Sequence, residues 1–132
     1  MFLNCTAHSL TQEQSHRANH YSNYLLDLKD DNPVLYENLT NCPPDIERIK
    51  ELVEELIEYL RIKWIESERM LIVHFPIGSP VFNAILFSKL DRMELPFRIL
   101  FSHSDRVSID KKLEDGTIIK KTVFKFIKFL EI

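Results

Sequence analysis

The spacing of apolar residues predicts one long helix in the middle of the chain. From Asp45 onward, apolar residues recur every three or four positions, and most residues between them are charged. The apolar positions are Ile46, Ile49, Leu52, Val53, Leu56, Leu60 and Trp64. Pro44 suits the first turn of such a helix, where its missing N–H costs nothing. The pattern predicts an amphipathic helix of about six turns that covers one face of a sheet.

Four short segments have the pattern of strands instead. Residues 1–5 are largely apolar, Tyr21–Leu28 alternates, and Met70–Phe75 and Phe97–Phe101 are nearly continuous apolar runs. Continuous runs of this length are typical of strands in a parallel sheet, which are buried on both faces. We therefore expect at least two central parallel strands.

Two further helices lie between these strands. Thr11 and Gln14 have the spacing of a capping box, so a helix is expected to begin near Thr11. Another follows Pro76–Pro80 and runs through Ala84, Leu86, Phe87 and Leu90. Residues 29–44 contain Pro33, Pro43 and Pro44 and are predicted to form an irregular connection.

The C-terminal part predicts a β-hairpin. Val107–Leu113 and Ile118–Phe129 flank Glu114–Thr117, which contains Asp-Gly, a strong turn signal. Phe124 and Phe126 share one face at strand spacing, and we expect that face to be buried against a helix rather than to form a platform for nucleic-acid bases. Alternating strands and helices predict right-handed parallel crossovers. The predicted fold is a single α/β domain over residues 1–132, with a small Rossmann-like, mainly parallel sheet, helices on both faces and an antiparallel hairpin at one edge.

Composition narrows the range of partners. Hydrophobic residues make up 45% and charged residues 28% of the 132 residues, the balance of a compact globular protein. No apolar run is long enough to cross a membrane, and the N-terminus lacks the positive region of a signal peptide. We therefore expect a cytoplasmic protein, with Cys5 and Cys42 as thiols. The net charge of −3 argues against long nucleic acids, but lysines and arginines near the C-terminus leave room for a small anionic ligand.

Three loops are predicted at the carboxyl ends of the strands, where parallel sheets bind ligands. They are Thr6–Ser9, Pro76–Ser79 and Ser102–Arg106. A glycine such as Gly78 lets backbone N–H groups approach an anion at a helix N-terminus, although a tight turn needs one equally. The guanidinium of Arg106 can bind a phosphate, or form an ion pair with a neighbouring aspartate.

The other candidates have a structural alternative as well. Ser79, Ser102 and Ser104 can donate to phosphate oxygens or serve as helix caps and turn residues. His8 and His103 can act as acid or base near neutral pH, or have structural roles only. His16 and His20 have a spacing suited to a metal, but no third ligand is placed by the sequence. The motifs of serine hydrolases, zinc proteases and P-loop proteins are absent.

Several of these residues together resemble a known family. His8-Ser9-Leu10-Thr11-Gln12-Glu13-Gln14 resembles the His-x-Leu-Thr-x-Glu-Gln opening of small CRISPR-associated proteins from type III systems. The Pro43-Pro44 pair, Gly78, Arg106 and the Asp-Gly hairpin with its Phe-rich last strand are also similar to that family. These proteins are similar to the CARF-like ring nucleases, which bind cyclic oligoadenylate and cut it to switch off signalling.

The resemblance implies a homodimer that holds cyclic tetra-adenylate across its two-fold axis. A ribose 2′-hydroxyl would attack the adjacent phosphate, giving linear di-adenylate without metal or cofactor. Arg106 would supply positive charge, Ser79 and Ser104 would contact phosphate oxygens, and His8 or His103 would move protons. Other expected ligand contacts are Thr6, Ser9, Gly78, Asn83 and Ser102.

Two positions depart from the family pattern. The loop Phe75–Ser79 lacks an acidic residue, and Phe126 stands where the last strand has a histidine. The alternative function is therefore a protein that sequesters or senses the same ligand without cutting it. A structural or protein-interaction domain without a nucleotide ligand is the third hypothesis.

Overall fold

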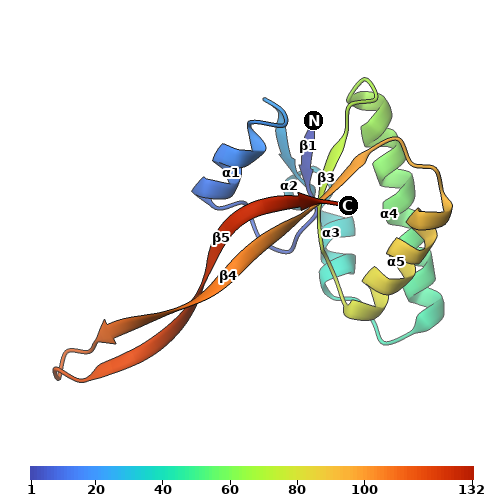
Figure 1. Ribbon diagram of the computed structural model, residues 1–132. Coiled ribbons are helices and arrows are strands. Elements are labelled where there is room, and N and C mark those ends of the chain that lie inside the picture. Colours follow the sequence, from blue (N-terminus) through green and yellow to red (C-terminus); the bar gives the residue numbers. More distant parts are fainter.

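The sheet has five strands in the order β2-β1-β3-β4-β5, and its first four strands are parallel. A computed structural model describes residues 1–132 (Figure 1). The strands are β1 (Phe2–Asn4), β2 (Leu25–Asp27), β3 (Ile72–Phe75), β4 (Arg98–Lys112) and β5 (Ile118–Glu131). Because β5 runs antiparallel to β4 at one edge, the predicted α/β fold with a C-terminal hairpin is confirmed.

Helices cover both faces of this sheet. They are α1 (Gln12–Ala18), α2 (Leu28–Asp31), α3 (Pro33–Thr40), α4 (Ile46–Glu66) and α5 (Pro80–Arg92). Figure 1 shows α1 on one side of the strands and α3, α4 and α5 on the other. No helix is both long and apolar enough to span a membrane.

The side chains of successive strand residues point into two cores, one on each face of the sheet. Leu3 and Val73 point into the larger core of 20 buried residues, which lies under α3, α4 and α5. A smaller core lies under α1 and consists of Phe2, Ala18, Ile72, Leu100 and Phe129. We call the α1 side of the sheet, with its continuation along β4 and β5, the α1 face. Successive strand residues point to opposite faces, so Asn4, His74 and Ser102 belong to the α1 face.

The long helix was predicted correctly, but two predictions on the segment before it were wrong. Residues 29–44 are not irregular, because they contain α3 and most of α2. Asn32 caps α3 by accepting a hydrogen bond from the N–H of Leu35. Pro44 lies outside α4, because the side chain of Asp45 caps that helix one residue later.

The strand beginning near Phe97 is much longer than predicted. Ser102–Arg106 does not form a loop but lies inside β4, where Asp105 pairs with Lys125 and Arg106 with Phe124. The strand continues because β5 offers backbone hydrogen bonds along its whole length. The predicted turn is confirmed at the far end, where Gly116 has a φ of 86°.

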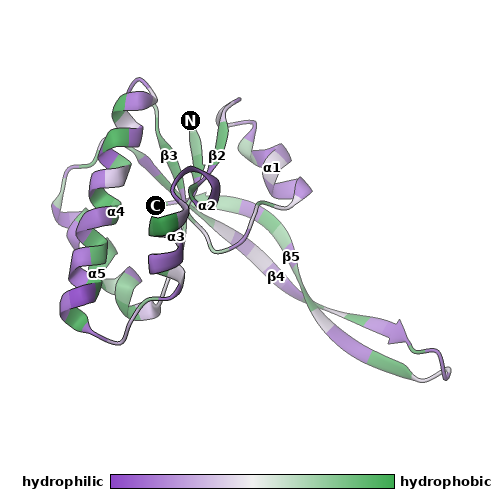
Figure 2. Ribbon diagram, turned by 180° about the vertical axis from the view of Figure 1, so that it is seen from behind, coloured by the Kyte–Doolittle hydropathy of each residue, from purple (hydrophilic) through white to green (hydrophobic).

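The hairpin extends well beyond the body of the domain (Figure 1). We call residues 103–128 the arm. Figure 2 shows that apolar and polar stretches alternate along it. Phe126 packs against the smaller core, as expected for that face, but Phe124 is 70% exposed, so its predicted burial was wrong. The reason is that α1 is short and covers only the base of the arm.

Candidate functional site

A row of polar side chains crosses the buried part of the α1 face. Asn4 on β1 lies opposite His74 on β3, and both side chains are only 2% exposed. Ser102 on β4 continues the row, two residues beyond Leu100, which pairs with His74. Three neighbouring strands therefore place an amide, an imidazole and a hydroxyl next to one another near the carboxyl edge of the sheet.

The hydrogen bonds of Asn4 fix the orientation of this row. Its Nδ2 donates to Oδ1 of Asp27 (2.6 Å) and to the carbonyl of His8 (2.9 Å). Oδ1 of Asn4 must therefore accept, and it lies 3.0 Å from Nδ1 of His74. An acceptor there requires that Nδ1 of His74 carries the proton. The imidazole of His74 is thus held as the Nδ1–H tautomer.

The other ring nitrogen of His74 is consequently an acceptor. Its Nε2 lies 2.7 Å from Oγ of Ser102, whose hydroxyl donates to it. The amide of Gln14, on α1, in turn donates to Oγ of Ser102 at 3.0 Å. The capping box of α1 holds Gln14 in place, because its Oε1 accepts from the N–H of Thr11 (2.9 Å). One directed chain of hydrogen bonds thus runs from α1 to the carboxylate of Asp27.

Burial keeps the imidazole of His74 neutral. The ring is surrounded by apolar groups, with the rings of Phe2 and Phe129 centred 6.1 and 5.1 Å away. Desolvation lowers the pKa of His74 from 6.5 to about 4. At neutral pH the ring has a free lone pair on Nε2 and can accept the proton of Ser102.

The predicted residues of the first loop lie beside this row. The hydroxyl of Thr6 is 2.8 Å from Oδ1 of Asn4 and 2.8 Å from the carbonyl of His8. The side chains of His8 and Ser9 are exposed. This loop therefore supports Asn4 through the Thr6 hydroxyl and the His8 carbonyl, and it leaves its own histidine side chain open to solvent.

Residues of the second predicted loop, Pro76–Ser79, and Asn83 after it make structural contacts. Gly78 has a φ of 77°, and a Cβ there would lie 2.9 Å from the carbonyl oxygen of Leu39. Ser79 caps α5 by accepting from the N–H of Phe82. Asn83 donates to the carbonyls of Ile77 and Ser79, and its Oδ1 is buried without a partner. A tight turn therefore explains Gly78, and a helix cap explains Ser79.

The side chains of the third predicted loop, Ser102–Arg106, point to two opposite faces of β4. Ser104 and Arg106 follow Ser102 at intervals of two residues and lie on the α1 face. His103 and Asp105 point to the opposite face, with Nε2 of His103 lying 3.6 Å from a carboxylate oxygen of Asp105. The predicted set therefore does not meet at one point, because β4 separates its odd-numbered from its even-numbered members.

Arg106 lies on the exposed part of the α1 face. Its guanidinium is 5.4 Å from the centre of the Phe124 ring, its partner across the hairpin. Phe126 pairs with Ser104 in the same way. The base of the arm thus presents cationic, aromatic and hydroxyl groups on one side.

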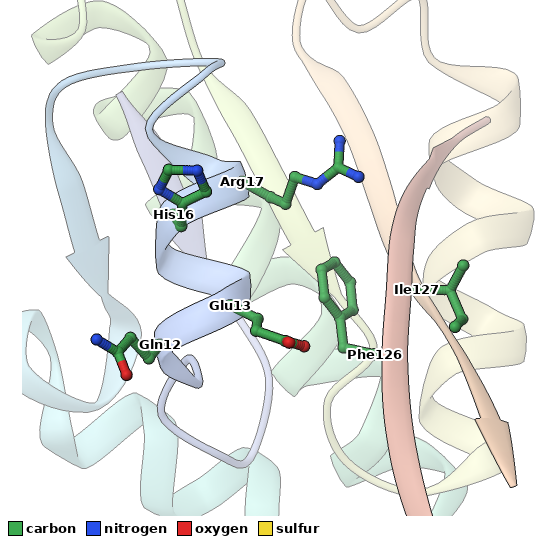
Figure 3. A pocket seen from close by; sticks show the side chains of 6 residues that line it. All are labelled: Gln12, Glu13, His16, Arg17, Phe126 and Ile127. Carbon is green, nitrogen blue, oxygen red and sulfur yellow. The ribbon is translucent and has the colours of Figure 1, made fainter. Parts of the chain in front are cut away.

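A groove of about 460 Å³ separates α1 from β5 beside this surface (Figure 3). It is lined by Gln12, Glu13, His16, Arg17, Phe126 and Ile127. In Figure 3 the side chains of Glu13 and Arg17 extend from α1 toward the side of the groove where Phe126 lies on β5. The rings of His16 and His20 lie 5.3 Å apart, and no group of three potential metal ligands is present in residues 1–132. The groove offers an aromatic ring and a guanidinium to a ligand.

The sequence patterns did not indicate the buried part of the site. Asn4, His74, Gln14 and Asp27 were not proposed, although polar residues in buried strands are rarely without a hydrogen-bonding role. His74 interrupts the apolar run Met70–Phe75, and this interruption was the available signal. Its partner on β4 is 28 residues away in sequence and could not be identified from spacing.

Comparison with known proteins gives a family but no activity. No curated protein and no solved structure matches the chain. One family model, described as the uncharacterized protein MJ1673 family, matches residues 1–130. Because the match covers nearly the whole chain, this protein belongs to the MJ1673 family.

Proposed function

We propose that the protein is a metal-independent ring nuclease that acts on cyclic oligoadenylate. It would bind cyclic tetra-adenylate as a homodimer in the cytoplasm and cut it to linear di-adenylate. That reaction would switch off type III CRISPR antiviral signalling. The proposal joins the resemblance of the opening motif and the hairpin to the chemistry of the α1 face.

The observation that carries the proposal is the composition of that face at the base of the arm. Ser102, Ser104 and Arg106 lie in line along β4, and Phe124 and Phe126 lie opposite them on β5. Guanidinium and hydroxyl groups bind phosphate oxygens, and aromatic rings stack on bases. The adjoining groove adds Arg17 to the same surface. This combination fits an oligonucleotide better than a small acid or an apolar ligand.

The arm also favours a dimer. Residues 103–128 contain seven lysines or arginines and four acidic residues, whereas the rest of the chain has ten basic and sixteen acidic residues. Exposed apolar residues on the arm are Ile109, Leu113, Ile118, Ile119, Phe124 and Ile127. An isolated two-stranded hairpin is barely stable in water. A second copy, with an acidic body, is a suitable partner for this basic and partly apolar arm.

A two-fold dimer would also match the ligand. A cyclic tetranucleotide can share a two-fold axis with the protein, so each subunit would contact one half of the ring. Arg106 would stabilise the negative charge that develops on a phosphate during attack by the adjacent 2′-hydroxyl. Ser104, about 7 Å farther from the arm's tip along the strand, would orient the phosphate oxygens.

The test is an assay with cyclic tetra-adenylate in the presence of EDTA, with products separated by chromatography. We expect the wild type to give linear di-adenylate and Arg106→Ala to lose at least 100-fold in rate. Arg92→Ala is the control, because Arg92 is an exposed cation on α5, on the opposite side of the sheet from Arg106. The control should cut at the wild-type rate.

The other outcomes separate the alternatives. If the ligand remains intact but co-elutes with the protein, the protein sequesters or senses cyclic oligoadenylate without cutting it. If the ligand is neither bound nor cut, the nucleotide hypothesis is wrong.

A further inference from the structure

The hydroxyl of Ser102 has one hydrogen-bonding position left. A serine oxygen donates one hydrogen bond and accepts up to two. Ser102 donates to Nε2 of His74 and accepts from Gln14, so one lone pair of Oγ is free. Ser102 is half-buried, whereas His74 behind it is nearly inaccessible. The free position is therefore a place, at the α1 end of this chain of hydrogen bonds, where a proton from a ligand can be received.

We propose that Ser102 and His74 form a proton relay that activates the attacking hydroxyl of the substrate. This inference rests on the proposed function, because it assigns the base for cleavage of a ribose phosphodiester. The free lone pair of Ser102 accepts the 2′-hydroxyl proton, and the proton of Ser102 passes to Nε2 of His74. Ser102 is thus the group that contacts the substrate, and His74 acts through it.

The bond changes balance without a cofactor. The 2′-oxygen forms a bond to phosphorus, and the bond from phosphorus to the 5′-oxygen breaks. The bonding pair stays on the 5′-oxygen, which takes a proton from water. The product ends in a 2′,3′-cyclic phosphate, and the imidazolium of His74 returns its proton to solvent through Ser102 after product release.

The surroundings of His74 prepare it to act as acceptor. The ring is fixed by Asn4, so Nε2 faces Ser102 without reorientation. The carboxylate of Asp27 lies beyond the Asn4 amide, which joins it to the ring through two hydrogen bonds. Burial lowers the pKa of His74 to about 4, so the ring is unprotonated at neutral pH and holds a transferred proton only transiently. The aromatic rings of Phe2 and Phe129 also lie beside the imidazole.

A structural role for the same contacts is the competing explanation. Ser102 and His74 tie β3 to β4, and Gln14 ties α1 to both, so their loss would loosen the sheet. A rate measurement alone would not separate the two roles. The test therefore compares a variant that removes a contact with one that restores it, and adds a variant that keeps the contacts but cannot take a proton.

The first comparison is made at Ser102, under single-turnover conditions with cyclic tetra-adenylate and EDTA. Ser102→Ala removes the hydroxyl, and we expect the cleavage rate to fall at least 100-fold while the dissociation constant changes less than threefold. Ser102→Thr keeps a hydroxyl and should recover most of the rate. Ser88→Ala, at an exposed position on α5 on the opposite side of the sheet, is the control and should behave as wild type.

The second comparison is made at His74. In His74→Gln, the amide can accept from Ser102 and donate to Asn4, but it cannot take a proton. We expect a rate as low as that of Ser102→Ala, and no further loss in the double variant, because the two residues act as one unit. Nitrogen-15 NMR of the wild type should show the neutral Nδ1–H tautomer at pH 7.

The outcomes distinguish the two proposals. If the wild type cuts cyclic tetra-adenylate and Ser102→Ala cuts it within threefold of that rate, the proposed relay is wrong, but the proposed ring nuclease activity is supported. If the wild type does not cut cyclic tetra-adenylate, the proposed function is wrong, and so is the relay, which depends on it. If nitrogen-15 NMR shows a protonated His74 ring at pH 7, that result alone contradicts the relay.

Discussion

Lowering the pH from 7 to 5 should destabilise this protein through one buried side chain, His74. Its pKa is lowered from 6.5 to about 4 in the folded state by burial. In the unfolded chain the same ring titrates near pH 6.5. Below pH 6.5 the unfolded state therefore binds a proton that the folded state does not. The free energy of unfolding falls as the pH drops through this window, and the loss levels off below about pH 4.

The size of the effect follows from the two pKa values. The complete shift corresponds to about 3 kcal/mol, since each pKa unit is worth about 1.4 kcal/mol. At pH 5 the unfolded ring is almost fully protonated and the folded ring mostly neutral, so about 2 kcal/mol is lost. Above pH 6.5 the contribution of His74 no longer changes with pH.

Urea denaturation followed by the fluorescence of the single tryptophan, Trp64, measures this loss. The wild type and His74→Gln are compared at pH 7 and pH 5. The other four histidines contribute equally to both proteins, so the difference between the two losses reports His74. We expect the wild type to lose about 2 kcal/mol more than the variant. Equal losses in the two proteins would refute the reasoning.

Three further predictions concern the arm, the glycines and the cysteines. Replacing residues 106–124 by an Asn-Gly turn should convert the proposed dimer to a monomer in light scattering, whereas a dimer that survives would place the interface elsewhere. Gly78→Ala should lower stability by about 2 kcal/mol, because of its positive φ and the close Leu39 carbonyl. Gly116→Ala is the control, since nothing lies within 4 Å of its Cβ, and an equal loss at both sites would contradict this explanation. Cys5 is buried and its pKa is raised, so a thiol reagent should label only Cys42 in the folded protein. Rapid labelling of both cysteines would contradict this prediction.

Local patterns in the sequence determined much of the fold. The apolar spacing after Asp45 predicted α4, the apolar run ending at Phe75 predicted β3, and Asp-Gly predicted the tip of the hairpin. The capping box at Thr11 and Gln14 was present as expected. Each of these signals is contained in a few neighbouring residues, so no knowledge of the tertiary structure was needed to read it.

The tertiary structure alone decided which polar groups meet. Ser102–Arg106 has the composition of a loop, but it is extended because β5, some 20 residues farther along the chain, supplies hydrogen bonds to it. His74 reads as part of an apolar strand, and only the register of β1, β3 and β4 places it between Asn4 and Ser102. Strand pairing joins residues that are far apart in sequence, and its side-chain period of two then sorts neighbours to opposite faces. For this reason the sequence could predict the edge where the candidate site lies, but not the hydrogen-bonded row of Asn4, His74 and Ser102 within it.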